Sequence, residues 1–91
     1  MGMINVDIWD DERFQKLTTT ARLIFIGMVS QADDDNVFDP DPKVIRARMH
    51  YCGSIIPPDQ FAADVQSIFA VGLAIPHLVD GTPRGAKLVQ E

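Results

Sequence analysis

The sequence has one cysteine, no long apolar run and few basic residues, and each shortage excludes a class of protein. Because Cys52 is alone, no disulfide can form within the chain, and a reducing cytoplasm is the expected location. No apolar stretch approaches the roughly 20 residues that a membrane-spanning helix needs. Residues 1–5 also lack the basic-then-apolar order of a signal peptide. We therefore expect a cytoplasmic protein with no membrane partner.

The shortage of basic residues bears on nucleic-acid binding. Eight Lys and Arg residues stand against thirteen Asp and Glu residues, which makes the formal charge −5. Because affinity for nucleic acid depends on neutralising phosphates, this balance disfavours an indiscriminate binder but leaves a local basic face open. A hydrophobic content of 46% is typical of a folded chain, and 91 residues make one domain, spanning 1–91.

The sequence contains no recognisable catalytic motif. Cys52 and Ser54 have His50 nearby, but no third residue that would orient the histidine follows, and no oxyanion signature is present. There is no glycine-rich loop that would cradle a phosphate. We therefore do not expect an enzyme.

The acidic run that begins at Asp33 has some of the alternation of a calcium loop. Val37 nevertheless occupies a ligand position, and Val44 stands where the bidentate glutamate belongs. His50 and His77 with Cys52 do not supply four zinc ligands at paired spacings. We expect a plain turn, no metal and no cofactor.

Three stretches have the spacing of helices and follow a short N-terminal arm. In the first, threonines 18–20 offer N-cap hydroxyls, and the apolar pattern predicts a buried central helix. In the second, Asp39 or Asp41 caps the helix, Pro42 opens it, and Cys52 is a candidate core residue. The third ends at Gly72. The expected ranges are 1–16 for the arm, with an extended strand over 3–8 and a helical turn over 10–16, then helices over 17–32, 42–52 and 58–71.

Strand patterns occupy the rest of the chain. Residues 37–38 are expected to pair with a later strand, and residues 73–90 form a hairpin. Pro76 places its strand at an edge or at a bulge, because proline cannot donate to a ladder. Residues 80–85 are predicted to be a loop, and residues 86–90 the return strand. The fold class is α+β, mostly α: a winged helix-turn-helix of three helices and a small antiparallel wing sheet.

The residues in this order resemble a known family, the N-terminal domain of phage replication proteins. These are the replisome organisers and helicase-loader-like proteins related to the DnaD group. The likeness covers nearly the whole chain and rests on Ile8-Trp9-Asp10, Leu17-Thr18, Ala21-Arg22-Leu23-Ile24-Phe25, Ala32-Asp33-Asp34-Asp35-Asn36, Pro42-Lys43-Val44-Ile45-Arg46-Ala47, Val71-Gly72-Leu73-Ala74-Ile75 and Val79-Asp80-Gly81. Asn36 stands where such proteins more often carry glycine, and asparagine tolerates the same left-handed conformation.

The resemblance implies a domain that binds origin DNA or self-associates. In the family, a further C-terminal region engages the helicase or DNA, so we expect this chain to be the N-terminal part of a longer protein, with a small stand-alone protein as the alternative. The implied partners are double-stranded DNA, a helicase or its loader, and a second copy of the chain.

A winged helix that reads DNA places its third helix in the major groove and its second helix and wing on the backbone. On this basis we predict phosphate contacts from the second helix and wing, and base contacts from the third helix. The candidate residues are Lys43, Arg46 and Arg48 on the second helix, Gln60, Asp64 and Ser67 on the third, and Arg84 and Lys87 on the wing.

An interaction module is the alternative prediction. The third helix has no Lys or Arg, and two carboxylates in a DNA groove would be repelled by its phosphates. Self-association or docking to a replication protein suits such a helix, and Trp9 is a candidate interface anchor that can also pack on its own core. A transcriptional regulator of the same fold is a third option, because fold alone does not determine function.

Overall fold

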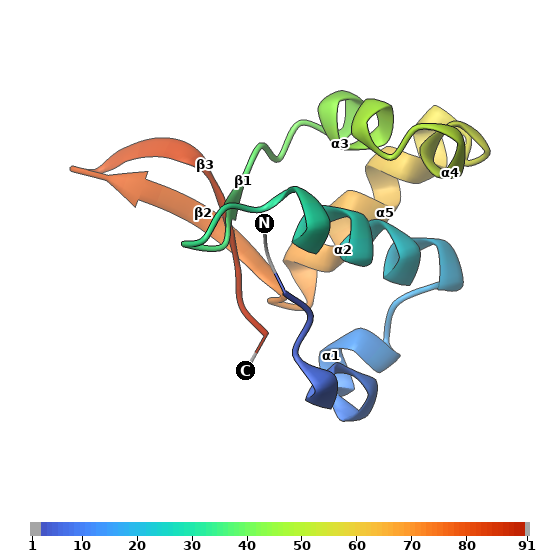
Figure 1. The fold of residues 1–91 in the computed structure, drawn as a ribbon, viewed down its shortest axis with the longest axis horizontal. Helices are drawn as coiled ribbons and strands as arrows, with labels where there is room; N and C mark the ends of the chain where they lie inside the picture. Colours follow the sequence, from blue (N-terminus) through green and yellow to red (C-terminus); the bar gives the residue numbers. More distant parts are fainter. Residues whose placement is uncertain (1–2, 91) are drawn as a thin grey trace.

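The computed structural model describes residues 3–90 and contains six helical segments and three strands, shown in Figure 1. The elements, in chain order, are the 3-10 helix η1 (Val6–Asp10), α1 (Glu12–Gln15), α2 (Thr19–Gln31), β1 (Val37–Phe38), α3 (Pro42–Arg48), α4 (Tyr51–Ser54), α5 (Pro58–Ala70), β2 (Ala74–Val79) and β3 (Thr82–Leu88).

Helix α2 is the centre of the core, as predicted, although it begins two residues later than expected. The Thr18 hydroxyl accepts a hydrogen bond from the Ala21 amide at 3.1 Å and so caps the helix. Ile24, Phe25 and Met28 are fully buried, whereas Ile26 lies on the exposed side. Helix α5 packs along α2 and confirms the third predicted helix. It ends before Gly72, whose φ of +87° is the left-handed conformation that glycine adopts at helix ends.

The strands form one antiparallel sheet in the order β1-β3-β2. The predicted pairing of residues 37–38 is confirmed, because Val37 lies opposite Lys87 in β3. Strand β2 is an edge strand with a register shift between Pro76 and Leu78, as the proline predicted. The predicted loop over 80–85 is wrong. Asp80 and Gly81 alone make the turn, and β3 already begins at Thr82.

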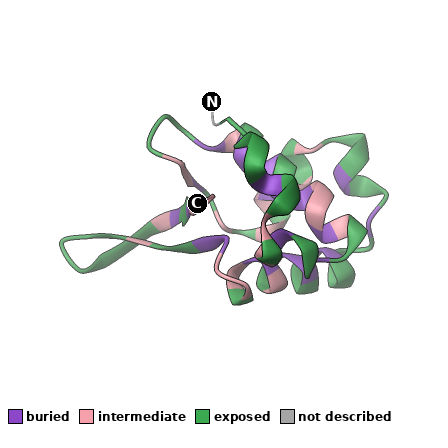
Figure 2. Cartoon of the chain, turned by 90° about the horizontal axis from the view of Figure 1, so that it is seen from below, coloured by how far each residue is buried: buried purple, intermediate pink, exposed green. Residues whose placement is uncertain are grey.

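The reason for this tight turn is backbone conformation. Asp80 and Gly81 have φ values of +52° and +79°, which form the mirror-image turn that matches the twist of a hairpin. Pairing therefore continues almost to the tip of the wing. The hairpin projects from the helical body, and most of its tip is exposed (Figure 2).

The N-terminal arm differs from the prediction. Residues predicted as a strand form η1, whose first amides are capped when the Asn5 side chain accepts from the Asp7 amide at 2.9 Å. Only Ile8 of this segment is buried. The helical turn predicted next is present as α1, and Phe14 and Leu17 are buried.

The second predicted helix is interrupted. It divides into α3 and α4 around His50, whose φ is +53°. Asp41 caps α3 and Pro42 opens it, as predicted, but Cys52 is exposed and does not belong to the core. The chain folds back because the Arg46 guanidinium donates to the carbonyls of Ser54 and Ile56 at 3.2 and 3.1 Å.

The molecule is therefore an α+β domain, mostly helical, in which three main helices precede a three-stranded antiparallel sheet. Strand β1, between the first two main helices, joins the sheet beside β3. This is the arrangement of a winged helix-turn-helix. In it, α5 takes the position of the recognition helix and the β2–β3 hairpin that of the wing.

Candidate nucleic-acid interface

Helices α3 and α5 enclose a shallow groove that is lined by small and apolar side chains. Pro40 and Pro42 form one side. Helix α5 forms the other with Ala62, Ala63, Gln66 and Ala70, while Val65 and Phe69 lie at its base. None of these residues is charged. We refer to this feature as the α3–α5 groove.

Two further hollows adjoin the groove. One, which we call the wing hollow, lies between α3 and the wing and is lined by Phe38, Asp39, Pro40, Arg48, Pro83 and Arg84, among others. The other lies beside the start of α5 and is lined by Asp41, Pro42, Lys43, Arg46, His50, Asp59 and Ala62, among others. Shared residues connect the three hollows: Pro40 links the wing hollow to the groove, and Pro42 with Ala62 links the groove to the second hollow. Basic side chains border the groove at both ends, together with Asp39 in the wing hollow and with Asp41 and Asp59 in the second hollow.

The residues predicted to contact bases lie differently from the prediction. Asp64 was expected on the exposed face of α5, but it is 6% exposed and faces α2. Its carboxylate accepts from the hydroxyls of Thr18 and Thr20 at 3.1 and 2.6 Å. Asp64 lies three residues after Phe61 and four before Ile68, so helical periodicity already indicated the buried face of α5. Its partners could not be read from that spacing, because the two hydroxyls lie more than forty residues away.

The other two predicted base contacts also make bonds within the protein. The Gln60 amide donates to the Thr20 hydroxyl at 3.0 Å, and the Ser67 hydroxyl donates to the carbonyl of Asp64 at 2.7 Å. Gln66 is exposed and lines the α3–α5 groove. The burial of Asp64 also leaves Asp59 as the one exposed carboxylate of α5, so this helix face is nearly neutral.

The residues predicted to contact phosphates line three different hollows. Arg48 and Arg84, which are far apart in the sequence, both line the wing hollow, whereas Lys43 lies in the hollow at the opposite end of the groove. Arg46 lines the same hollow as Lys43, but its guanidinium is engaged with the carbonyls of Ser54 and Ile56. Lys87 lies elsewhere, beside Asn5, Asn36 and Ile75. The structure thus brings Arg48 and Arg84 together and separates Lys87 from them.

The Asp64 network yields a test of stability. We expect Asp64→Ala to lower the free energy of unfolding by about 1–3 kcal/mol, because two hydroxyls lose a charged acceptor at the α2–α5 contact. Asp64→Asn should cost less, since its amide oxygen can still accept one bond. Asp59→Ala, an exposed carboxylate removed from the same helix, should change the unfolding free energy by less than about 1 kcal/mol. Urea denaturation followed by circular dichroism measures all three, and an Asp64→Ala variant as stable as Asp59→Ala would contradict the assigned role.

The α3–α5 groove was not foreseen from the sequence. Its signal was present as small or uncharged residues at intervals of four, namely Ala62, Gln66 and Ala70. Such a spacing places side chains on one helical face.

Between residues 3 and 90, no group of three or more His, Cys, Asp or Glu side chains is placed to hold a metal ion. None of the helices described is long and apolar enough to cross a membrane.

The protein is therefore a winged helix-turn-helix domain. Its α3–α5 groove is uncharged and lies between two hollows that are partly basic. In comparisons with known proteins, no family model, no curated protein and no solved structure matches the chain.

Proposed function

We propose that this chain is the DNA-contacting winged-helix domain of a phage or prophage replication protein that acts in the cytoplasm. In this proposal it helps to place the protein on origin DNA, where a helicase or its loader is the expected partner. The proposal rests on the winged-helix arrangement and on the family resemblance of the sequence. The observation that carries it is that Arg48 and Arg84, from distant parts of the chain, both line the wing hollow.

The contact is with phosphates rather than with bases. Gln60, Asp64 and Ser67 already bond within the protein, and α5 has no basic residue to reach a guanine edge. Arg48 at the end of α3 and Arg84 on the wing instead present guanidinium groups beside one hollow, and guanidinium groups suit phosphate oxygens. Asp39 also lines this hollow and moderates its positive charge. We therefore propose weak, salt-sensitive and sequence-tolerant binding to duplex DNA.

Fluorescence anisotropy with a labelled duplex tests this proposal. Between about 50 and 200 mM salt, log K against log salt should have a slope of about −2 to −4, which corresponds to two to four neutralised phosphates. Arg48→Ala and Arg84→Ala should each reduce the steepness of this slope by about 1.

The matched control is Lys16→Ala, because Lys16 is exposed and follows α1, away from the three hollows. It removes the same unit charge and should leave the slope nearly unchanged. Absence of binding at the lowest salt, or an equal effect of Lys16→Ala and Arg48→Ala, would refute phosphate contact at the wing hollow.

A second candidate function is a protein-interaction module of a replication protein. The observation in its favour is the α3–α5 groove, which occupies the recognition position but is lined by alanines and prolines. Surfaces of this kind suit an apolar partner better than a polyanion.

A further inference from the structure

The 3-10 helix η1 presents an apolar row of side chains to solvent. Side chains of a 3-10 helix repeat every three residues, so η1 has three faces. One face is buried and carries Ile8. On the next face Val6 and Trp9 are 80% and 66% exposed, and Met3, which precedes them at the same spacing, is 83% exposed. Large apolar side chains that are exposed together mark an interaction site. We call Met3, Val6 and Trp9 the apolar stripe.

Carboxylates surround the apolar stripe. They come from the third face of η1, from the start of α1 and from the turn that shares a hollow with Met3, and the exposed ones are Asp7, Asp10, Glu12, Asp33 and Asp34. Basic side chains are fewer here: Lys16 and Arg22 lie beside the end of α1, and Lys87 shares a hollow with Asn5. The charge beside the stripe is therefore predominantly negative.

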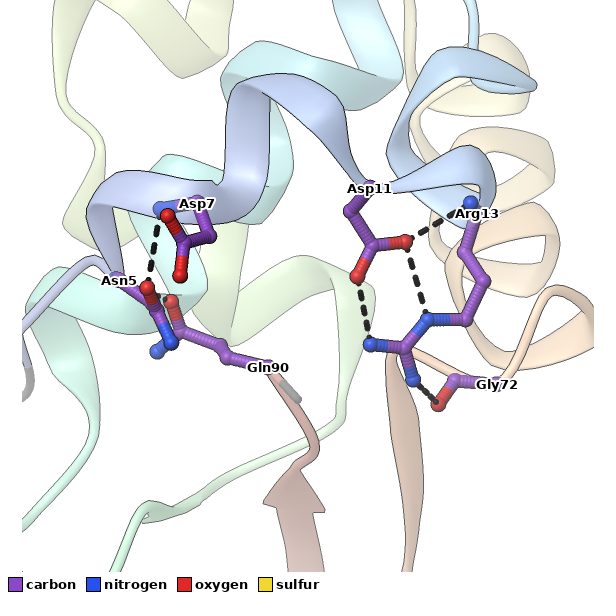
Figure 3. A network of polar contacts seen from close by, with 6 residues as sticks. All are labelled: Asn5, Asp7, Asp11, Arg13, Gly72 and Gln90. Atoms are coloured by element: carbon purple, nitrogen blue, oxygen red, sulfur yellow. Dashed lines mark hydrogen bonds and ion pairs between the residues drawn. The ribbon is translucent and has the colours of Figure 1, made fainter.

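Hydrogen bonds to the chain's other end hold the apolar stripe in place. The Gln90 side chain donates to the Met3 carbonyl at 2.8 Å and accepts from the Asn5 amide at 2.7 Å. The Asn5 side chain in turn caps η1 by accepting from the Asp7 amide, as Figure 3 shows. The stripe is therefore fixed beside the end of the sheet before any partner arrives.

A second anchor lies beyond η1. Arg13 pairs with Asp11 at 2.7 Å and donates to the Gly72 carbonyl at 3.1 Å, which ties the start of α1 to the turn before β2 (Figure 3). The hydrogen bond from Arg13 lowers the pKa of Asp11 below its usual value of 3.8, against the opposing effect of burial. The Trp9 ring rests edge-on against Phe14, at 5.8 Å between centroids, and stays mostly in solvent. A surface ordered in this way loses little conformational freedom on binding.

The charge beside the stripe selects the class of partner. Carboxylates repel nucleic acids and anionic lipid surfaces, so the stripe suits a protein surface that combines apolar and basic side chains. A second copy offers no such helix. Among the helices between residues 3 and 90, large exposed apolar side chains occur in η1, α2 and α4. Helices η1 and α4 contain no Lys or Arg, and the single basic residue of α2, Arg22, donates to the carbonyls of Phe14 and Gln15.

The spacing of the stripe matches that of an α-helix. Three residues of a 3-10 helix rise about 6 Å, which is the separation of Val6 and Trp9 along η1. Side chains four residues apart on an α-helix are also about 5–6 Å apart. An apolar row of such a helix can therefore lie along the stripe. Basic side chains on one flank of that helix then lie beside Asp7 and Asp10.

We propose that the apolar stripe is the docking surface for a basic amphipathic α-helix of another protein, whose Lys or Arg side chains pair with Asp7 and Asp10. The inference goes beyond the proposed function, because it requires neither DNA contact nor the α3–α5 groove. In Figure 1 the N-terminal segment and α1 lie at the bottom of the molecule, and α3 lies at the top. None of the stripe residues lines the wing hollow, so the partner helix leaves that hollow open.

A synthetic peptide tests this chemistry. It has about 16 residues, long enough for a helix rich in alanine, and carries lysines together with leucines at every fourth position. Trp9 is the only tryptophan of the protein and the peptide has none, so a blue shift of Trp9 emission reports burial of the stripe. We expect a saturable blue shift at about 150 mM salt, where long-range attraction between charges is largely screened. The same peptide with glutamate in place of lysine should give no shift at tenfold higher concentration.

Three variants locate the contact. Val6→Asp places a charge in the apolar stripe and should weaken peptide binding by about tenfold or more, and Asp10→Lys should weaken it about threefold to tenfold. The matched control is Asp59→Lys, which changes the charge of the protein equally but lies in the second hollow beside Lys43, and it should change the affinity by less than about twofold. All three positions are exposed, so the fold should survive, as circular dichroism will verify.

Several results would overturn the proposal. One is the absence of a blue shift with the lysine peptide at millimolar concentration. Another is an equal loss of affinity for Asp59→Lys and Asp10→Lys, which would mean that the peptide follows net charge alone. Equal binding of the glutamate peptide would reject the pairing with Asp7 and Asp10. Sedimentation velocity of the protein alone completes the test, because self-association that Val6→Asp abolishes would make a second copy the occupant. These measurements contain no DNA, so their failure leaves the phosphate-contact proposal standing.

Discussion

Replacing Phe25 by alanine is expected to lower the free energy of unfolding by about 3–5 kcal/mol. The Phe25 ring is fully buried in α2 and meets Phe14 edge-on, with 5.8 Å between ring centroids. Phe14 in turn contacts Trp9 at the surface, so the lost ring leaves a cavity beneath the N-terminal segment. A domain of this size has about 5–13 kcal/mol of stability in total, and much of it should therefore be lost.

Urea denaturation followed by circular dichroism and by Trp9 emission measures the effect. Ile26→Ala is the matched control, because Ile26 follows Phe25 in the same helix but is exposed, and its truncation should cost about 1 kcal/mol or less. If Phe25→Ala proves too unstable to analyse, Phe25→Leu should show a loss of about 1–2 kcal/mol. Equal losses for Phe25→Ala and Ile26→Ala would contradict the position of the core.

Gly53→Ala should destabilise the protein by about 1–3 kcal/mol, although alanine is normally the better residue within a helix by about 1 kcal/mol. A Cβ atom at Gly53 would lie 2.2 Å from the carbonyl oxygen of Arg46, and a backbone atom cannot rotate away. Helix α4 would have to move off α3. The Arg46 hydrogen bonds to the carbonyls of Ser54 and Ile56 would then be strained or lost.

The direction of the change in stability distinguishes the two possible outcomes of this substitution. Thermal denaturation should show a lower midpoint for Gly53→Ala, whereas the exposed neighbour substitution Cys52→Ala should change stability by about 0.5 kcal/mol or less. A raised midpoint for Gly53→Ala would mean that α3 and α4 are not in contact there. Because α3 borders the candidate interface, the variant should also weaken any function that depends on that face.

Local signals predicted much of the fold. The Thr18 cap and the apolar spacing that follows it are contained within one helix, as are Pro42 at the start of α3 and Gly72 after α5. The pairing of residues 37–38 and the irregularity at Pro76 also followed from local chemistry, because a two-residue strand needs a partner and proline lacks a donor.

The predictions that failed depended on distant residues. Asp64 was read as exposed although it lies three residues after the buried Phe61, and only the folded chain brings Thr18 and Thr20 to it. The break between α3 and α4 follows from contacts of Arg46 and Gly53 across that break, which no spacing reveals. Of the segment predicted as a strand, residues 6–8 belong to η1, and the residues before them are bonded to Gln90 from the far end of the chain.

The candidate site was also predictable only in part. The list of basic residues could be read from the sequence, but their grouping could not. Arg48 and Arg84 both line the wing hollow because β1 and β3 pair and bring the wing toward α3, while Lys87 lines a different hollow with Asn5, Asn36 and Ile75. The α3–α5 groove is likewise a property of two helices together.

The sequence by itself determined the order of the three main helices and the wing strands, and the helix caps, because these depend on interactions within a few residues. Tertiary structure alone decided which polar groups are engaged inside the protein and which remain available. A charged or amide side chain satisfies its hydrogen bonds with whatever the fold places beside it, and those neighbours come from distant parts of the chain.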